Sequence, residues 1–182
     1  MKKLLIIAGL LGVASGVFAQ GTLTFANGAG GVNAPVTDHN GAKINAPNFV
    51  ADLYYSTDTA AATSSLIPAG FNVSFSTVAG GGYFLGGVRT IAGVTGTIEA
   101  QVRVWDTATY ASYDAAKVGP GGEWGFSNPT ILVTLATGAT PPPAMTGLTG
   151  FQLTMNPAVP EPSTFALAGL GAAALLVFRR RK

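Results

Sequence analysis

The chain has 182 residues, of which only 10% are charged, and it contains 25 glycines, 11 prolines and no cysteine. This length leaves room for one domain of about 140 residues between the two ends, and the low charge argues against a soluble cytoplasmic enzyme. The lack of cysteine excludes disulfides, thiolate metal sites and a cysteine nucleophile. Between Gln20 and Ala158, seven carboxylates outnumber four cations, so no basic stripe is available to bind a nucleic acid.

Residues 1–19 have the pattern of a secretory signal peptide. Lys2 and Lys3 precede an apolar segment that runs from Leu4 to Phe18, and Ala19 is a small residue just before the composition changes at Gln20. These are the positive region, the hydrophobic region and the cleavage site on which signal peptidase acts. We therefore predict cleavage between Ala19 and Gln20 and export of the mature chain. An uncleaved membrane anchor is the alternative.

Six segments of the middle region alternate apolar and polar residues with a period of two, which is typical of half-buried strands. Turn signals separate them, such as Asn27-Gly28 and Asn128-Pro129. The predicted strands include Leu23 to Phe25, Phe49 to Tyr55, Phe71 to Phe75, Ile98 to Val104, Ile131 to Leu135 and Phe151 to Met155. The pattern predicts an all-β fold, an antiparallel β-sandwich or jelly-roll-like single domain at residues 20–156. One short helical turn is expected between Trp105 and Lys117.

Residues that could carry catalysis are few in this domain. The only histidine, His39, lies in a polar turn beside Asp38, and no GxSxG, HExxH or P-loop motif occurs. A glycan hydrolase would need two carboxylates from among Glu99, Asp106, Asp114 and Glu123. The position of Glu99 on the polar face of a strand instead favours an ion pair with Arg103 or Arg89. We therefore predict that the protein is not an enzyme.

We also predict no cofactor and no metal site. The oxygen atoms of Asp38, Asn40 and Asn45 could hold a calcium ion within one loop, but the spacing is not that of an EF-hand. Asp and Asn are also ordinary turn-forming residues, which is the simpler explanation of this loop.

Several aromatic residues fall on the predicted polar faces of strands or in loops. They are Tyr54, Trp105, Tyr110, Tyr113 and Trp124. Exposed rings of this kind stack on sugars, which makes Trp105, Trp124, Tyr110 and Tyr113 candidates for carbohydrate contact. Packing against a neighbouring loop or a second layer is the alternative for the same rings. A carbohydrate-binding module is therefore the alternative function, ahead of a small glycan hydrolase.

The C-terminal residues 157–182 have three parts in a fixed order. A Pro160-Glu161-Pro162 triplet comes first, residues 164–178 carry no charge, and Arg179, Arg180, Arg181 and Lys182 close the sequence. A helix of fifteen residues spans about 22 Å, somewhat less than the roughly 30 Å of a bilayer's hydrocarbon core. We therefore predict a marginal transmembrane helix at 164–178. Basic clusters stay on the cytoplasmic side, so residues 179–182 are predicted to form a stop-transfer cluster.

This tail resembles the PEP-CTERM sorting signal of Gram-negative bacteria. The resemblance implies that Pro160, Glu161 and Pro162 form a motif recognised in the membrane by an exosortase-type transpeptidase. The middle region is also similar to a group of small Gly/Thr-rich PEP-CTERM proteins of environmental bacteria. The similar segments are Gln20 to Asn27, Val32 to Val36, Ala100 to Asp106 and Phe126 to Pro129. This second resemblance implies location and a β-fold, not a chemistry.

Together these patterns predict an exported protein that is tethered to the inner membrane by its tail and then sorted to the cell envelope, the cell surface or the extracellular matrix. We expect a non-enzymatic structural or adhesive component associated with exopolysaccharide. The expected partners are signal peptidase, an exosortase-type transpeptidase, the membrane and exopolysaccharide, and no nucleic acid.

Overall fold

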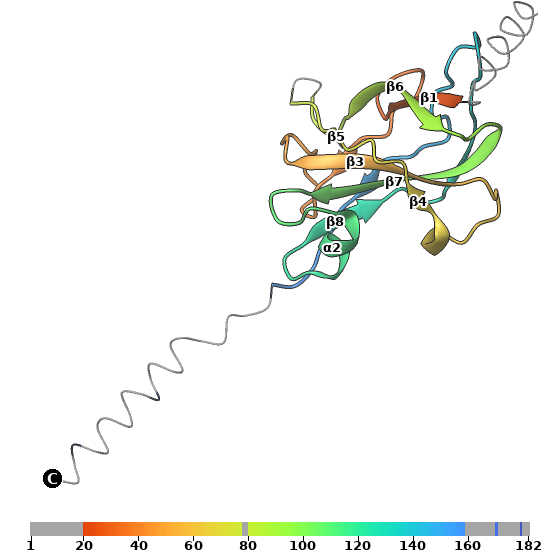
Figure 1. The fold of residues 1–182 in the computed structure, drawn as a ribbon. Helices are drawn as coiled ribbons and strands as arrows, with labels where there is room; N and C mark the ends of the chain where they lie inside the picture. Colours follow the sequence, from red (N-terminus) through yellow and green to blue (C-terminus); the bar gives the residue numbers. More distant parts are fainter. Residues whose placement is uncertain (1–19, 78–79, 159–169, 171–178, 180–182) are drawn as a thin grey trace, which may run out of the picture.

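Figure 1 shows the computed structural model, which describes residues 20–77, 80–158, 170 and 179. Eleven strands, one 3-10 turn and one helix make up the described domain. In chain order they are β1 (Gln20–Ala26), β2 (Val36–Thr37), β3 (Phe49–Ser56), η1 (Thr63–Ser65), β4 (Ile67–Pro68), β5 (Val73–Ser74), β6 (Leu85–Ala92), β7 (Thr97–Asp106), α2 (Tyr113–Val118), β8 (Glu123–Phe126), β9 (Ile131–Thr134), β10 (Phe151–Gln152) and β11 (Thr154–Met155).

The largest sheet is built around β3 and β7, the two long strands in the middle of Figure 1. These strands pair antiparallel without interruption from Phe49 opposite Asp106 to Ser56 opposite Glu99. The sheet order is β11-β8-β7-β3-β4, with β5 also paired to β3 and β9 also paired to β7. Both long strands therefore have neighbours along each edge, and nearly every residue of β7 is buried because apolar clusters cover both faces of the sheet.

A second antiparallel pair, β1 with β6, lies against the same core and is joined to the large sheet at two places. Thr22 of β1 bridges Ala136, which follows β9, and Phe84 before β6 bridges Phe75 after β5. The strands thus follow one another around the core in the order β1, β6, β5, β3, β7, β9 and back to β1. The short β2–β10 pair is parallel, whereas the sequence predicted antiparallel pairing.

The core lies between these strands and is apolar, as the alternation requires. Leu23 and Phe25 from β1, Leu53 from β3 and Val102 from β7 are fully buried there. Four phenylalanines pack in one group, with the ring centroids of Phe25 and Phe84 4.8 Å apart. The others in this group are Phe71 and Phe75. Burying aromatic rings of this size supplies a large part of the folding free energy.

The helix α2 covers the opposite face of the large sheet beside β8 (Figure 1). Its N-cap is Ser112, whose hydroxyl accepts a hydrogen bond from the Ala115 amide at 3.3 Å. Asp114 in the first turn and Lys117 in the last complement the helix dipole. Tyr113 and Ala116 form its buried side. The predicted short helix after the fourth long segment is therefore confirmed.

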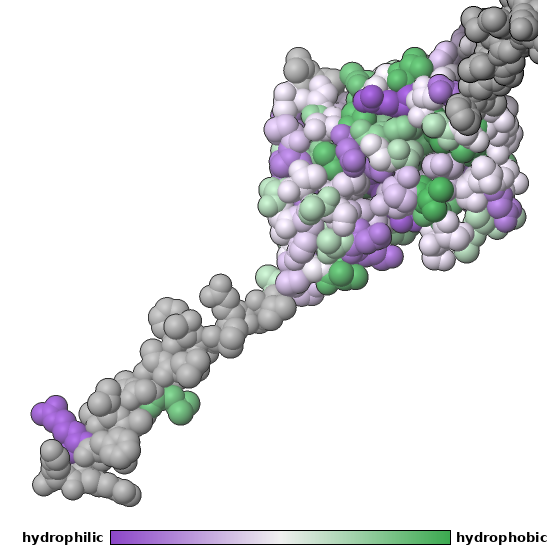
Figure 2. All heavy atoms as spheres, in the orientation of Figure 1, coloured by the Kyte–Doolittle hydropathy of each residue, from purple (hydrophilic) through white to green (hydrophobic). Residues whose placement is uncertain are grey.

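The described domain is all-β apart from these short turns, as predicted, whereas the sandwich or jelly-roll topology stays a prediction. Its surface is weakly polar rather than highly charged. On the face drawn in Figure 2, most spheres are pale and the strongly hydrophilic and strongly hydrophobic ones are scattered. This matches the low content of charged residues. In the described part of the chain, no helix is long and apolar enough to cross a membrane.

Candidate functional site

The two faces of the β3–β7 pair differ in chemistry. Residues 51 and 53 of β3 and 98, 100, 102 and 104 of β7 enter the main core. The alternate residues point to the other face, where Val50 lies opposite Trp105, Asp52 opposite Arg103 and Tyr54 opposite Gln101. A second apolar cluster covers part of this face, made of Val50, Tyr54, Leu66, Trp105, Tyr113 and Ala116. Polar and aromatic side chains are thus buried side by side.

Arg103 is the central residue of this second face. Only 9% of it is exposed, yet it carries a full positive charge at any physiological pH. Its Nε donates to Gln101 Oε1 at 2.9 Å and its Nη2 donates to the Thr63 carbonyl at 2.6 Å. Its guanidinium carbon lies 4.0 Å from the Tyr54 ring centroid and 5.0 Å from that of Tyr113. Hydrogen bonds and two aromatic faces therefore hold this cation in one orientation.

Asp52, the strand neighbour of Arg103, does not neutralise it. The carboxylate accepts hydrogen bonds from the backbone amides of Leu53, Gly70 and Phe71 at 2.7–3.1 Å. Burial raises the pKa of this carboxyl above its ordinary 3.8, although those amides act in the opposite direction. Within the described ranges the one ion pair joins His39 to Glu123, so Arg103 has no carboxylate partner there.

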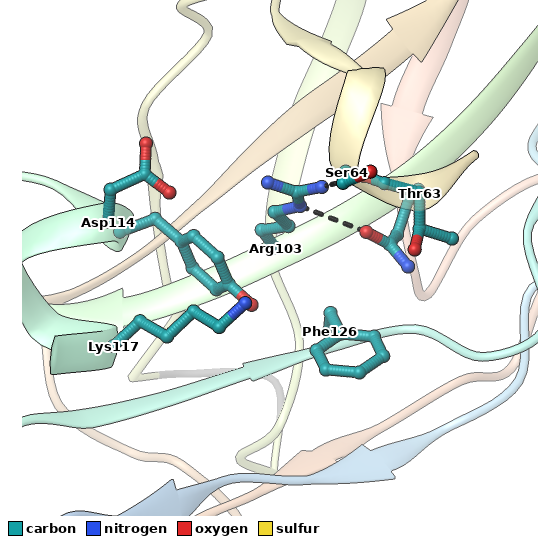
Figure 3. A pocket seen from close by; sticks show the side chains of 8 residues that line it. Thr63, Ser64, Arg103, Asp114, Lys117 and Phe126 are labelled. Atoms are coloured by element: carbon teal, nitrogen blue, oxygen red, sulfur yellow. Dashed lines mark hydrogen bonds between the residues drawn. The ribbon is translucent and has the colours of Figure 1, made fainter. Parts of the chain in front are cut away.

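A cleft of ≈ 220 Å³ opens beside Arg103. In Figure 3, Arg103 lies between helix α2, which carries Asp114 and Lys117, and the turn that carries Thr63 and Ser64. Gln101, Tyr113 and Phe126 complete the lining. The cleft therefore combines two cations and one carboxylate with hydroxyl groups and aromatic rings.

The aromatic residues around the cleft form a connected group. Phe126 is 39% exposed, and its ring stacks on Trp124 with an interplanar angle of 15° and a centroid distance of 6.3 Å. Lys117 Nζ lies 5.6 Å from the Trp124 ring centroid. Burial raises the pKa values of the Tyr113 and Tyr54 hydroxyls, so both rings stay neutral and can face a cation.

Asn156, directly after β11, makes several hydrogen bonds to the region of α2 and β8. Its side-chain amide donates to the carbonyls of Ala116, Lys117 and Gly119 at 2.8–3.0 Å, which lie at the C-terminal end of α2. Its Oδ1 accepts from Trp124 Nε1 at 3.0 Å. Asn156 thus satisfies the carbonyls that a helix end leaves unpaired and fastens the end of the domain to the cover of the cleft.

These hydrogen bonds of Asn156 form what we call the Asn156 clamp. Two residues after it, a match to a known family model begins. Residues 158–182 match the PEP-CTERM protein-sorting motif. The chain therefore carries a PEP-CTERM sorting motif at its C-terminal end. The motif implies export, processing by exosortase-type machinery and membrane-associated sorting to the cell envelope. Comparison with curated proteins and with solved structures gave no match.

The predicted parts of the PEP-CTERM tail fall largely outside the described residues. Pro160, Glu161, Pro162, most of the helix at 164–178 and Arg180 to Lys182 belong to the undescribed ranges, and Leu170 and Arg179 are described as helical. The signal peptide at 1–19, including Ala19, is also outside them. Gln20, the predicted first residue after cleavage, is the first residue of β1.

The structure corrects the expected exposure of the aromatic residues. Trp105 and Tyr113 are only 4% and 2% exposed, and Tyr54 is also buried, because α2 and the loop before β4 cover their face of the sheet. Trp124 and Tyr110 are half-buried, and the Tyr110 hydroxyl donates to the Pro120 carbonyl at 2.8 Å. Trp105 and Tyr113 therefore pack within covered structure, which was the alternative to sugar contact. Among the aromatic rings that line the cleft, Phe126 is the more exposed.

The structure also corrects the predicted partner of Glu99. Its Oε1 accepts from the Thr130 hydroxyl at 2.6 Å, and its buried Oε2 has no hydrogen-bond partner. The ion pair with Arg103 or Arg89 is therefore wrong. Glu99 lies opposite Ser56 in the sheet register, four residues along β7 from Arg103, so the two side chains use different neighbours.

The other acidic residues are engaged separately. Asp106 accepts from Asn48 Nδ2 at 2.6 Å and from the Ala108 amide. Asp38 accepts from the amides of Asn40 and Ala42, which is an ordinary turn geometry. No group of three or more His, Cys, Asp or Glu side chains able to hold a metal occurs in the described part of the protein.

Sequence reasoning missed the contact between His39 and Glu123. Glu123 Oε1 lies 2.9 Å from His39 Nδ1 and accepts from the His39 amide at 2.8 Å. Gln152 Nε2 donates to the His39 carbonyl at 2.9 Å. The His39 turn is therefore fastened to β8 and β10 across the fold. The two partners are 84 residues apart, and no local pattern connects them.

Proposed function

We propose that this protein is an exported, non-enzymatic structural or adhesive component of the cell envelope or extracellular matrix, associated with exopolysaccharide. The observation that carries the proposal is the PEP-CTERM motif at 158–182, which begins two residues after the Asn156 clamp closes the domain. In this proposal signal peptidase releases the chain before Gln20. The tail then holds it at the inner membrane until an exosortase-type transpeptidase acts at Pro160 to Pro162.

The position of the clamp supports processing without loss of the fold. The described strands end at Met155, and the last hydrogen bonds that fasten the domain are those of Asn156. A cut at or beside residues 160–162 leaves all of these contacts on the released side. The domain can therefore be transferred to the surface as an intact unit.

The surroundings of the acidic residues support a non-enzymatic role. Glu99, Asp106 and Glu123 each hold structural hydrogen bonds to different parts of the fold. A glycan hydrolase needs one carboxyl group free to protonate a leaving group and a second one facing it across the substrate. We therefore expect no glycan turnover by the purified protein.

The intact mass of the protein recovered from the native cell surface tests the proposal. We expect a mass that begins at Gln20 and ends between Pro160 and Ser163. A species that keeps Arg179 to Lys182 would overturn the processing step, and a protein found only in the cytoplasm would overturn export. Replacing the triplet by Pro160→Ala, Glu161→Gln and Pro162→Ala should leave the full tail attached. Pro157→Ala, which lies just outside the matched residues, is the control and should be processed normally.

A further inference from the structure

Arg103 is a buried cation that the described domain leaves without a counter-ion. Removing a charge from water is costly unless an opposite charge or hydrogen bonds replace the lost hydration. Gln101 and the Thr63 carbonyl meet only part of that need, and Asp52 is committed to the amides of a neighbouring loop. Because Arg103 lines an open cleft, an external carboxylate can reach the guanidinium and form a charge-assisted hydrogen bond.

The charges at the rim favour a ligand with a single negative charge. Lys117 adds a second cation, while Asp114 on the same helix adds a carboxylate, so the lining carries a net charge of +1. The domain between Gln20 and Ala158 is net negative, which disfavours phosphate-rich polymers such as nucleic acids. One carboxylate per bound unit suits this balance.

The rest of the lining suits a sugar ring. Phe126 offers an exposed aromatic face supported by Trp124, and sugars pack their apolar C–H faces on such rings. The exposed residues Thr63 and Ser64 and the amide of Gln101 offer hydrogen-bonding groups for ring hydroxyls. A volume of ≈ 220 Å³ is below the roughly 300–1,000 Å³ of sites for drug-sized ligands, so one ring fits rather than several.

We propose that this cleft binds the carboxylate-bearing ring of an acidic saccharide, a uronate-type sugar, with Arg103 holding the carboxylate and Phe126 the ring. This inference rests on the proposed association with exopolysaccharide and names the class of sugar. Another cleft of the described domain provides a contrast. It measures ≈ 290 Å³ and is lined by Gly28, Val32, Asn33, Tyr83 and Leu85, without a charged side chain.

Isothermal titration of the full chain in a polyoxyethylene detergent, which contains no sugar, tests the inference. The probes are the methyl glycoside of galacturonate, its methyl ester and the corresponding methyl galactoside. The methyl ester keeps the ring and removes the charge, so we expect it and the neutral sugar to bind at least about tenfold more weakly than the acid. Equal binding of the acid and its ester, or no binding of the acid, would overturn the proposal.

Variants assign the binding to this cleft. Phe126→Ala should weaken binding of the galacturonate probe about tenfold and Lys117→Gln about threefold, because the ring is a main contact and the lysine a solvent-exposed one. Leu132→Ala and Lys43→Gln are the matched controls, since both residues are exposed and lie outside the cleft lining. They should bind as the unmodified chain does. Loss of binding in the controls, or unchanged binding in Phe126→Ala, would place the site elsewhere.

Arg103→Lys keeps the charge and removes the planar, forked geometry, so it should bind the acid at least about tenfold more weakly. Circular dichroism and thermal unfolding check that this variant is folded, and Phe126→Ala and Lys117→Gln keep the proposal testable if it is not. Tighter binding of a polyglutamate peptide than of galacturonate would assign the carboxylate to a protein partner and overturn the saccharide. Normal mass and surface location without uronate binding would overturn this inference alone, leaving the proposed function intact.

Discussion

Both faces of the β3–β7 pair are buried, but they are stabilised differently. The core face contains aliphatic and aromatic side chains that need only close packing. The other face contains Asp52, Gln101 and Arg103 among tyrosine and tryptophan rings, and each polar atom there needs a specific partner. The comparison shows that alternation along a strand assigns a side chain to a face, whereas the depth of burial depends on what later covers that face.

Leu53→Ala should show the largest effect and defines the apolar side of the comparison. Leu53 is fully buried, and its truncation removes apolar contacts and leaves a cavity. We expect the free energy of unfolding to fall by about 3 kcal/mol, measured by urea denaturation of the full chain. Leu132→Ala, at a residue that is 59% exposed, is the control and should change it by less than about 0.5 kcal/mol. Similar losses for both leucines would contradict the assigned core.

The two tryptophans allow a sharper test of the polar face. Trp124 Nε1 donates to Asn156 Oδ1, whereas Trp105 Nε1 is buried without a hydrogen-bond partner. The stability lost through Trp124→Phe should therefore be about 1 kcal/mol smaller in an Asn156→Ala background, where the hydrogen bond is already absent, whereas the loss through Trp105→Phe should be the same in both backgrounds. Urea unfolding followed by circular dichroism compares the two variants. An equal loss through Trp124→Phe in both backgrounds would contradict its hydrogen bond to Asn156.

Asp52 should give the smallest effect, visible as a dependence on pH. Burial raises its pKa in the folded protein above 3.8, so the folded state binds the proton more tightly than the unfolded state. The stability that Asp52 contributes is fully present below pH 3.8 and is lost as the pH rises through the raised pKa. The unfolding free energy of the unmodified chain minus that of Asp52→Asn should therefore decrease as the pH rises toward neutral. A difference that grows with rising pH would contradict the raised pKa.

The long strands β3 and β7 and the short helix could be predicted because their signals are local. The alternation in 98–104 and the cluster of polar and small residues before Tyr113 each depend on near neighbours. Asn27 shows the limit of such signals. It reads as a turn residue before a glycine, yet it is fully buried, and its side-chain amide donates to the carbonyls of Ala34 and Gly82 at 2.7 and 2.8 Å.

The site could be predicted only in part. Trp105, Tyr113 and Tyr54 were expected to be exposed but are buried, because the cover supplied by α2 comes from a separate segment of the chain. The partners of Glu99 and His39 were also missed, since both depend on residues that pairing across the sheet brings close. Phe126, the open ring of the cleft, lies on a strand too short to show a clear period.

The sequence by itself determined the PEP-CTERM sorting motif, the all-β class and the face to which the residues of the long strands β3 and β7 point. These properties depend on composition, order and local periodicity, which a linear pattern contains in full. Only the tertiary structure decided that the polar face of β3 and β7 is buried, that Arg103 has no carboxylate partner among the described residues and that a cleft opens beside it. Those properties depend on contacts between residues far apart in the chain, which form only when the sheet closes and α2 packs across it.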